Sequence, residues 1–367
     1  MRVLHVIDTS EVGGGQTAVG HLLRGLGHRG VEAELACRPG GPLMDTAAAA
    51  GARTHAIAFD KQFSPRKAQQ LARVAEAGRF DVIHTHGLLA TYYTAMAREC
   101  FGVGTPLVYH QHGFHHHNHR RLTRRARMLA ERLLCWRSDR VVAVSSRDLA
   151  DLSAGGYGAR QRLRLVHYGL PEPMPVSRDA ARSSLGLDGN APVVGLVARL
   201  HPQKGVDCFL AAARLLHDTH PGARFVIVGT GELEDTLRAQ VDRLGLRGAI
   251  TWVTDGRRGV DAMPAFDVAV LSSRWEGLPL VLLEYMALRR PIVATTVAGC
   301  LDAIGPEQAS LVPPDAPVEM AAAMRGLIDA PEEARARGAS ARARFDEQFT
   351  LTRMIERVMA LYEEVQA

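Results

Sequence analysis

Two basic residues close together in the second half of the chain have the spacing of an anion site. Arg199 ends an expected strand over 193–197, and Lys204 follows five residues later, where the next helix is expected to begin. A guanidinium, an ammonium and a helix N-terminus together would hold a diphosphate well. A structural salt bridge is the alternative interpretation. The pattern favours a phosphate-bearing ligand.

Two glutamates follow the expected strand over 268–271 and are separated by seven residues. Glu276 is expected in the loop after the strand, and Glu284 two turns into a helix starting near Pro279. A carboxylate among apolar residues is costly to bury without hydrogen-bond donors, and sugar or ribose hydroxyls are such donors. The alternative is one helix-capping glutamate and one unrelated carboxylate. The pair favours a ligand that carries hydroxyl groups.

A glycine-rich turn follows the first expected strand, over 3–7. Gly13, Gly14 and Gly15 would let the backbone approach a ligand, and their N–H groups with the following helix N-terminus favour an anion. The spacing does not match the Gly-x-Gly-x-x-Gly pattern of dinucleotide folds. The turn predicts either a phosphate cradle or a plain tight turn.

Histidines are frequent in the first half. His84 and His86 end one expected strand, and His112 precedes Gly113 after the next, a position suited to hydrogen-bonding a substrate. The run 115–117 with His119 has the composition of a metal site, but no carboxylate lies nearby to orient the rings. The chain also has no Asp-x-Asp pair. We therefore expect no metal site.

The net charge of +5 is concentrated in one segment. Residues 115–140 contain eight arginines and two acidic residues, a local balance of +6. The spacing of its apolar residues predicts a basic amphipathic helix, suited to an anionic membrane surface or an acidic acceptor. A solvated helix with one face in the core is the alternative, and nucleic acid is disfavoured because no recognised binding motif accompanies the charge. The apolar residues are Leu122, Met128, Leu129, Leu133 and Trp136.

Length and composition indicate a folded enzyme of two α/β domains. The chain has 367 residues, of which 47% are hydrophobic and 23% charged, which excludes disordered and collagen-like classes. No apolar run approaches the ~18–20 residues that cross a bilayer, and the N-terminus has the pattern of a buried strand. Five cysteines without metal-binding spacing favour reduced thiols in the cytoplasm.

Strand and helix patterns alternate in both halves, which predicts two Rossmann-like, doubly wound parallel sheets joined by a linker over 171–178. We expect domains over 1–172 and 173–349, and a last helix within 350–367 that crosses back to the first domain. Ligands of such sheets bind at the carboxyl ends of the strands, here facing a cleft between the domains. The expected strands are 3–7, 32–37, 54–58, 82–85, 107–110, 141–144, 163–166, 193–197, 224–228, 250–253, 268–271, 292–294 and 311–312.

Taken in order, these motifs resemble the retaining glycosyltransferases of family 4, which have the GT-B fold. The likeness covers nearly the whole chain, and the combination of the Arg/Lys pair with Glu-x7-Glu is highly specific. The motifs are Gly13-Gly14-Gly15, His112-Gly113, Val166-His167-Tyr168-Gly169, Arg199 with Lys204-Gly205, Val228-Gly229-Thr230-Gly231 and Glu276-x7-Glu284.

The resemblance implies a role for each motif. Arg199 and Lys204 would hold the donor diphosphate, Glu284 the nucleotide ribose, and Glu276 the transferred sugar near the reacting carbon. His112 would contact the sugar from the other domain. By the same resemblance Gly229, Gly277 and Leu278 complete the donor site, Gly13, Gly14 and Gly15 form an acceptor or phosphate loop, and the catalytic set is Glu276, His112, Arg199 and Lys204.

The chain departs from the family pattern at two places. The family often has Pro-Asn-Gly where this chain has His167-Tyr168-Gly169, and Gly-Gly-x-x-Glu where it has Ala298-Gly299-Cys300-Leu301-Asp302. The roles of those family side chains are therefore not carried over.

The resemblance implies retaining transfer of a sugar from a nucleotide-diphosphate donor to a saccharide or lipid-linked acceptor hydroxyl, with no metal or cofactor. The setting expected is envelope polysaccharide or glycolipid assembly, in the cytoplasm and with residues 115–140 as a candidate contact with the inner face of the membrane. Alternatives are a GT-B nucleotide-sugar epimerase or phosphorylase, and an inactive sugar-nucleotide-binding or scaffolding subunit.

Overall fold

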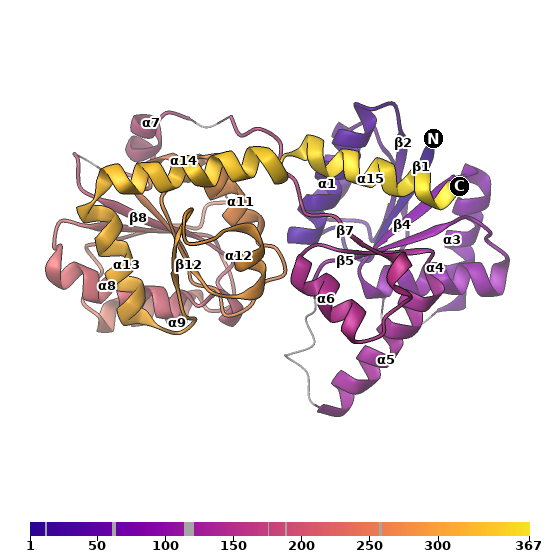
Figure 1. Cartoon of the computed structure of the whole chain (residues 1–367), viewed down its shortest axis with the longest axis horizontal. Coiled ribbons are helices and arrows are strands. Elements are labelled where there is room, and N and C mark those ends of the chain that lie inside the picture. The colour runs from indigo at the N-terminus through magenta and orange to yellow at the C-terminus, as the bar shows by residue number, and fades with distance from the viewer. Residues whose placement is uncertain (12, 61–63, 114–120, 175, 188, 257–258) are drawn as a thin grey trace. The chain divides into compact units, whose positions relative to one another are not determined.

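The computed structural model describes residues 1–11, 13–60, 64–113, 121–174, 176–187, 189–256 and 259–367. They form two compact units, described separately below. Unit 1 comprises Met1–Pro171 with Thr350–Ala367, and unit 2 comprises Glu172–Phe349. Each unit is built on one parallel sheet with helices packed against it (Figure 1), so the prediction of two doubly wound α/β sheets is confirmed.

Unit 1 has a seven-stranded sheet. Its strands are β1 (Arg2–Ile7), β2 (Glu32–Cys37), β3 (Arg53–Ala56), β4 (Val82–His86), β5 (Leu107–Gln111), β6 (Arg140–Ala143) and β7 (Leu163–Leu165). All neighbours are parallel, in the order β3-β2-β1-β4-β5-β6-β7. From β1, strands β2 and β3 are added on one side and strands β4 to β7 on the other. This reversal creates a topological switch point between β1 and β4.

Alternate residues of these strands enter two different apolar layers, as the period of two in a strand requires. On one face of the sheet, Val3 packs with Met354 and Val358 of the C-terminal helix. On the other face, Leu4 packs with Leu71. The helices of the unit are α1 (Gly14–Gly27), α2 (Pro42–Ala49), α3 (Pro65–Gly78), α4 (Leu88–Phe101), α5 (Arg121–Arg137), α6 (Ser146–Ala154) and α15 (Leu351–Gln366).

The last helix, α15, belongs to unit 1 although it follows the whole of unit 2 in sequence. It lies along α1 (Figure 1), where Gly25 leaves room for Ile355. The Thr350 hydroxyl accepts a bond from Arg353 N and caps the helix, and Leu351 N donates to Leu170 O at 2.7 Å. Its apolar face is thereby buried on the first sheet.

Unit 2 repeats the plan with six strands in the order β10-β9-β8-β11-β12-β13, all parallel. The strands are β8 (Val193–Val197), β9 (Arg224–Val228), β10 (Ile250–Val253), β11 (Val268–Leu271), β12 (Ile292–Thr295) and β13 (Ser310–Val312). Its switch point lies between β8 and β11. The loops after these two strands carry the predicted Arg/Lys pair and the first predicted glutamate.

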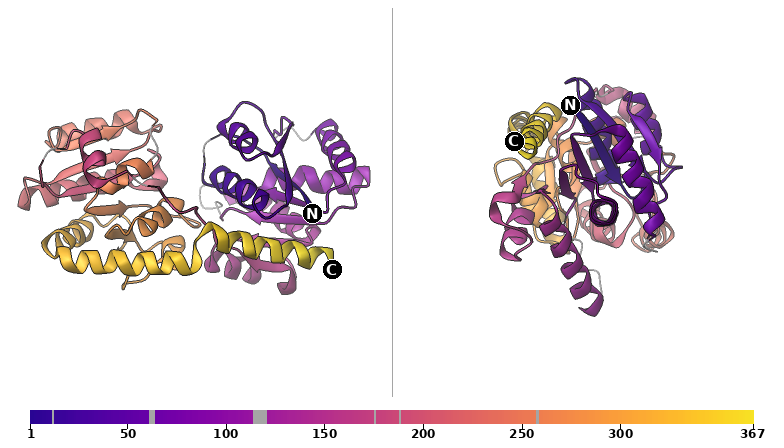
Figure 2. Two further views of the ribbon diagram at one scale, coloured as in Figure 1. Left: turned by 90° about the horizontal axis from the view of Figure 1, so that it is seen from above. Right: turned by 90° about the vertical axis from the view of Figure 1, so that its right-hand side faces the viewer.

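Helices cover both faces of the second sheet (Figure 2). Phe209 and Met320 are buried in one apolar layer, and the helix that contains Leu282 contributes to the opposite side. The helices are α7 (Arg178–Ser184), α8 (Val206–Thr219), α9 (Glu234–Arg243), α10 (Gly259–Ala262), α11 (Leu280–Ala287), α12 (Ala298–Ala303), α13 (Pro317–Asp329) and α14 (Pro331–Gln348).

Two further features concern membrane-spanning helices and the cysteines. Among the described residues, no helix combines the length and the apolar character needed to span a bilayer. All five cysteines are free thiols, and four of them are buried.

Candidate functional site

The connection from β8 to α8 places Arg199 and Lys204 at the carboxyl edge of the second sheet. A 3₁₀ turn over Pro202–Lys204 leads into α8, so Lys204 lies directly before the helix N-terminus, as predicted from the sequence. Arg199 is exposed, and its side chain has no partner among the residues that the structure describes. The two cations therefore differ, because Lys204 is largely enclosed.

Lys204 is paired with Glu276, which lies in the connection from β11 to α11. The Lys204 ammonium donates to Glu276 Oε1 at 2.5 Å, and the two side chains are 18% and 7% exposed. The Ser273 hydroxyl donates to the same oxygen at 2.6 Å. The salt bridge that the sequence left as an alternative is thus present for Lys204. It joins two predicted site residues that lie in the connections after the neighbouring strands β8 and β11.

Backbone contacts hold these two loops together. The Ser272 hydroxyl donates to Lys204 O at 2.7 Å, and Arg274 N donates to Gln203 O at 2.8 Å. The Gln203 amide donates in turn to Trp275 O at 2.9 Å. Because most of these bonds involve backbone groups, the spacing between Lys204 and Glu276 is set by the course of the loops.

Glycines permit this close approach. A Cβ on Gly205, whose φ is +59°, would come within 2.1 Å of Ser272 O, and one on Gly299 would come within 1.9 Å of Gly277 O. Gly229, after β9, lies against Ala198 O, immediately before Arg199. The loops at this edge of the sheet are therefore in contact with adjacent segments. They contain three predicted site residues, namely Gly229, Gly277 and Arg199.

The other predicted donor residues lie on or near α11. Leu278 is buried, and Glu284 is partly buried in the second turn of the helix, with Pro279 as its N-cap. Burial, and after it the carboxylate of Glu276, raise the pKa of the Cys300 thiol on α12. Gly299 lies in α12, in the segment that departs from the family pattern, and its contact with Gly277 O shows that this segment packs onto the Glu276 loop.

In unit 1 the glycine turn and His112 lie together. Helix α1 begins at Gly14, with Gly13 as its N-cap, and a Cβ on Gly15 would be 3.3 Å from the His112 ring. Both ring nitrogens of His112 have protein partners: Nε2 lies 3.1 Å from His86 Nδ1, and Nδ1 lies 2.5 Å from the Tyr168 hydroxyl. The glycine turn and the predicted histidine thus lie next to each other at the carboxyl edge of the first sheet.

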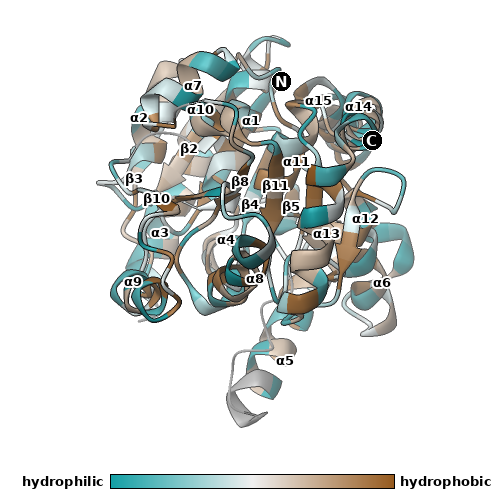
Figure 3. Ribbon diagram, turned by 90° about the vertical axis from the view of Figure 1, so that its left-hand side faces the viewer, coloured by the Kyte–Doolittle hydropathy of each residue, from teal (hydrophilic) through white to brown (hydrophobic). Residues whose placement is uncertain are grey.

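Helix α5 confirms the predicted helix but presents its apolar residues to solvent. Leu129, Leu133 and Trp136 are 70%, 54% and 48% exposed, while Leu134 and Cys135 face the interior. The helix projects beyond the rest of its own unit (Figure 3). The alternative, in which these residues face the core, does not hold for Leu129, Leu133 and Trp136, because Leu134 and Cys135 on a different stripe of the same helix are buried instead.

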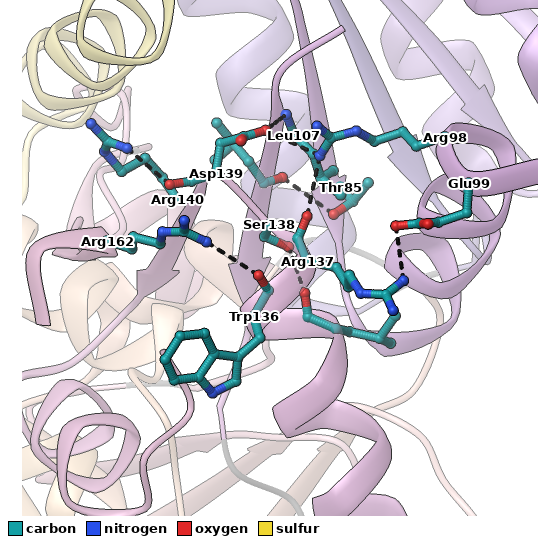
Figure 4. A network of polar contacts seen from close by, with 12 residues as sticks. Thr85, Arg98, Glu99, Leu107, Trp136, Arg137, Ser138, Asp139, Arg140 and Arg162 are labelled. Atoms are coloured by element: carbon teal, nitrogen blue, oxygen red, sulfur yellow. Dashed lines mark hydrogen bonds and ion pairs between the residues drawn. The ribbon is translucent and has the colours of Figure 1, made fainter. Parts of the chain in front are cut away.

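The C-terminal end of α5 is fixed by polar contacts (Figure 4). Arg137 pairs with Glu99 of α4 at 2.8 Å, and Arg162 donates to Trp136 O at 3.2 Å. His115, His116, His117 and His119 lie outside the described residues.

Sequence reasoning missed several residues that support the site. Gln203, Ser272 and Ser273 are ordinary loop residues by type, and only the pairing of β8 with β11 reveals that they converge. Tyr168 was noted only as a departure from a motif. Arg274, missed entirely, donates to both Asp207 and Asp315 and ties the β11 loop to α8.

Family models match both halves of the chain. A model described as glycosyl transferase 4-like domain matches residues 13–169, and one described as glycosyl transferases group 1 matches residues 177–344. The chain is 31% identical over 361 residues to D-inositol 3-phosphate glycosyltransferase of Rhodococcus erythropolis, covering 88% of this chain and 80% of the relative. It is 32% identical to D-inositol 3-phosphate glycosyltransferase 2 of Catenulispora acidiphila, covering 70% of this chain but only 64% of that relative's length.

The fold is also that of solved structures. HepE of Anabaena, whose crystal structure contains UDP and glucose, superposes with a TM-score of 0.87 at 20% identity, over 99% of each chain. With its two parallel-sheet units, the protein has the GT-B fold. The chain belongs to glycosyltransferase family 4.

Proposed function

We propose that the protein is a retaining glycosyltransferase that moves a sugar from a nucleoside-diphosphate donor to an acceptor hydroxyl. Unit 2 binds the donor and unit 1 the acceptor. The observation that carries the proposal is the Lys204–Glu276 ion pair together with Arg199, which has no partner among the described residues. All three follow strands β8 and β11 at the carboxyl edge of the switch point.

In this proposal the difficult step is breaking the bond between the anomeric carbon and the donor phosphate oxygen. Negative charge then grows on the leaving diphosphate, where Arg199, Lys204 and the N-terminus of α8 stabilise it. Glu276 faces the sugar, whose anomeric carbon gains positive charge. The acceptor oxygen attacks the same face, and its proton passes to the leaving phosphate, so configuration is retained and no metal is required.

The donor is proposed to be a UDP-sugar, because UDP and glucose are the ligands in the HepE crystal structure with the same fold. The acceptor is proposed to be a hydroxyl on a phosphorylated polyol, a saccharide or a lipid-linked saccharide, in keeping with relatives named for inositol phosphate. Thermal-shift measurements with UDP-, GDP-, ADP- and dTDP-sugars test the donor, and stabilisation by a different nucleotide alone would overturn this choice.

Turnover of three variants tests the site. Arg199→Ala, Lys204→Ala and Glu276→Ala should each lower kcat on the order of 100-fold, as removal of one preorganised charged group does. Arg325→Ala is the matched control, because Arg325 is an exposed arginine of α13 in the same unit and has no partner in the part of the chain that the structure describes. Folding is checked by circular dichroism, and near-normal transfer by all three site variants would refute the assignment.

We further propose that α5 binds an anionic membrane surface and brings the enzyme to a lipid-linked acceptor in envelope polysaccharide or glycolipid assembly. The support is the exposed stripe Leu129, Leu133 and Trp136, flanked by exposed Arg125 and Arg127 that have no partner among the described residues. Apolar side chains enter the headgroup region while the arginines meet lipid phosphates.

Co-sedimentation with phosphatidylcholine vesicles, with and without phosphatidylglycerol, tests the membrane proposal. The protein should sediment with the anionic vesicles, and the double variant Leu129→Ser, Leu133→Ser should not. Val318→Ser is the control, since Val318 is an equally exposed apolar residue of α13. Equal binding by the double variant, or no binding to anionic vesicles, would exclude α5 as the contact.

A further inference from the structure

Five histidine rings of unit 1 lie in contact on one face of the sheet. They occupy alternate positions of three adjacent strands, with His5 opposite His84 and His86 opposite His110 in the strand register. His110 stacks on His112 with ring centroids 4.7 Å apart. All except His112 are fully buried. Of the five, the family resemblance gives a role only to His112, which would contact the transferred sugar.

Three of these rings and the Tyr168 hydroxyl form a continuous line of hydrogen bonds, here called the Tyr168 line. The Tyr168 hydroxyl lies 2.5 Å from His112 Nδ1, and His112 Nε2 lies 3.1 Å from His86 Nδ1. His86 Nε2 then lies 3.0 Å from His5 Nδ1. The line ends at His5 Nε2, which is buried and has no partner among the described residues.

A second, shorter line runs beside it, here called the Tyr362 line. The hydroxyl of Tyr362, on α15, lies 2.6 Å from His84 Nδ1, and His84 Nε2 lies 3.2 Å from His110 Nδ1. This line also ends at a buried nitrogen without a described partner, His110 Nε2. Both lines therefore start at a tyrosine hydroxyl and end at an imidazole Nε2.

The tyrosines determine the direction of each line. A neutral imidazole has one N–H, so the proton on each ring depends on the bond at its other nitrogen. If Tyr168 donates, each ring of its line accepts at Nδ1 and donates from Nε2, and only the N–H of His5 is unpaired. If Tyr168 accepts instead, its own hydrogen and the His5 lone pair both lack a partner among the described residues, which costs more.

Burial keeps the four fully buried rings uncharged. It lowers the pKa of His5 to about 3, and burial together with repulsion from neighbouring histidines lowers the pKa of His84, His86 and His110. Burial also raises the pKa of Tyr168 and Tyr362, so both hydroxyls keep their protons.

We propose that Tyr168 is a positioning residue for His112, and that its hydroxyl holds His112, His86 and His5 together in the Nε2–H tautomer. This inference rests on the proposed function only where it assigns a consequence for catalysis. In that setting a second proton on His112 would place positive charge near the developing positive charge of the sugar and raise the barrier. With Tyr168 donating to Nδ1, His112 has no vacant nitrogen to accept that proton.

The proposal gives the sequence departure at His167-Tyr168-Gly169 a physical meaning. Where the family often has asparagine, this chain has a tyrosine whose ring is buried and whose hydroxyl reaches the predicted sugar-contacting histidine. Tyr362 is the natural comparison, because it has the same contact with a histidine that belongs to the other line.

A metal ion is the competing explanation for the cluster. One nitrogen from each of His5, His84 and His86 lies within 4.8 Å of the others. Hydrogen bonds fit better, because His5 Nδ1 and His86 Nε2 are 3.0 Å apart and already paired with each other. Stoichiometric zinc, copper or nickel in protein purified without added metal would overturn the proposal.

Tautomers of ¹⁵N-histidine-labelled protein test the proposal without reference to activity. Long-range ¹H–¹⁵N spectra at neutral pH should show the five rings as Nε2–H. Tyr168→Phe should shift His112, His86 and His5 together toward Nδ1–H and leave His84 and His110 unchanged, while Tyr362→Phe should do the reverse. An Nδ1–H or charged His112 in the unmodified protein, or unchanged rings in Tyr168→Phe, would overturn the proposal.

Kinetics then separate the inference from the proposed function. Tyr168→Phe should lower kcat roughly 10-fold, as expected for loss of one positioned hydrogen bond, change the donor KM little, and move the acid limb of the kcat profile to higher pH. Tyr362→Phe should leave kcat unchanged. A tautomer shift with an unchanged kcat and pH profile would refute the positioning role, whereas normal turnover by His112→Ala would refute the proposed role of His112 itself.

Discussion

At the scale of single residues, Lys204 and Glu276 form an ion pair, and the proposed donor must replace this contact when its diphosphate binds Lys204. Lys204 is proposed to hold the diphosphate, yet without ligand its charge is already neutralised by Glu276 at 2.5 Å. In the proposed site the carboxylate assigned to the sugar therefore also competes with the phosphate for the same ammonium. Arg199, which has no such partner among the described residues, is free of this competition.

Glu276→Gln should consequently have opposite effects on binding and on turnover. Removing the negative charge frees Lys204, so UDP should bind about 5-fold more tightly, equivalent to about 1 kcal/mol. The proposed sugar contact is weakened, so kcat should fall. Isothermal titration with UDP and steady-state transfer measure the two effects, and weaker UDP binding by the variant would contradict the competition.

At the scale of elements, the site depends on how closely successive loops pack at the edge of the second sheet. Gly299, at the start of α12, lies against Gly277 O, and Gly205 lies against Ser272 O. Arg274 adds bonds to Asp207 and Asp315 beyond this edge. The loops act as one packed layer, so a change in α12 is transmitted to the Glu276 segment.

Gly299→Ala should therefore disturb the site although Gly299 itself has no proposed role in binding. The added methyl group must displace the 276–277 backbone, which should cost about 2 kcal/mol of stability, as overpacking does, and lower turnover. Gly248→Ala is the control, because a Cβ there meets no atom within 4 Å. Urea denaturation and transfer assays measure both effects, and equal behaviour of the two variants would show that α12 is not coupled to the site.

At the scale of the whole molecule, the two units differ in what their interiors contain. The first unit buries a cluster of histidine rings on one face of its sheet. The second unit instead has a continuous apolar layer that includes Phe209 and Val270. Buried neutral histidines must gain protons when the chain unfolds in acid. Acid should therefore weaken the first unit selectively.

Acidification from pH 7.5 to pH 5 should destabilise unit 1. The pKa of His5 is about 3 when folded, against 6.5 when unfolded, so the unfolded state binds the extra proton throughout this range. His5 alone should remove about 2 kcal/mol by pH 5, and His84, His86 and His110 act in the same direction. The added stability is present above pH 6.5 and is lost as the pH falls.

Urea-dependent hydrogen exchange at the two pH values measures this effect separately for each unit. Peptides from β4 should lose stability at pH 5, whereas peptides from β11 serve as the internal control because no histidine lies in that strand. An equal free energy of opening of β4 at both values would contradict the account.

The sequence by itself determined the strands, the two sheets and the loops that hold the candidate residues. Buried parallel strands are short apolar runs, and their carboxyl ends are followed by Arg199, Glu276 and His112, so position along the chain already indicates position in the fold. Helix α14 was not predicted, because its alanine- and arginine-rich sequence has no clear apolar stripe. Gly338 of that helix lies against the carbonyl oxygen of Arg289, a contact that exists only in the folded chain.

The tertiary structure decided which side chains meet. His84 with His86 and His110 with His112 already show the two-residue period of one strand face, but their pairing with His5, Tyr168 and Tyr362 depends on strand order and on where α15 docks. It also decided which stripe of α5 is buried, since a helix with two apolar stripes does not specify by sequence which one faces its sheet. Local patterns fix elements because they depend on neighbouring residues, whereas long-range contacts depend on the packing of the whole unit.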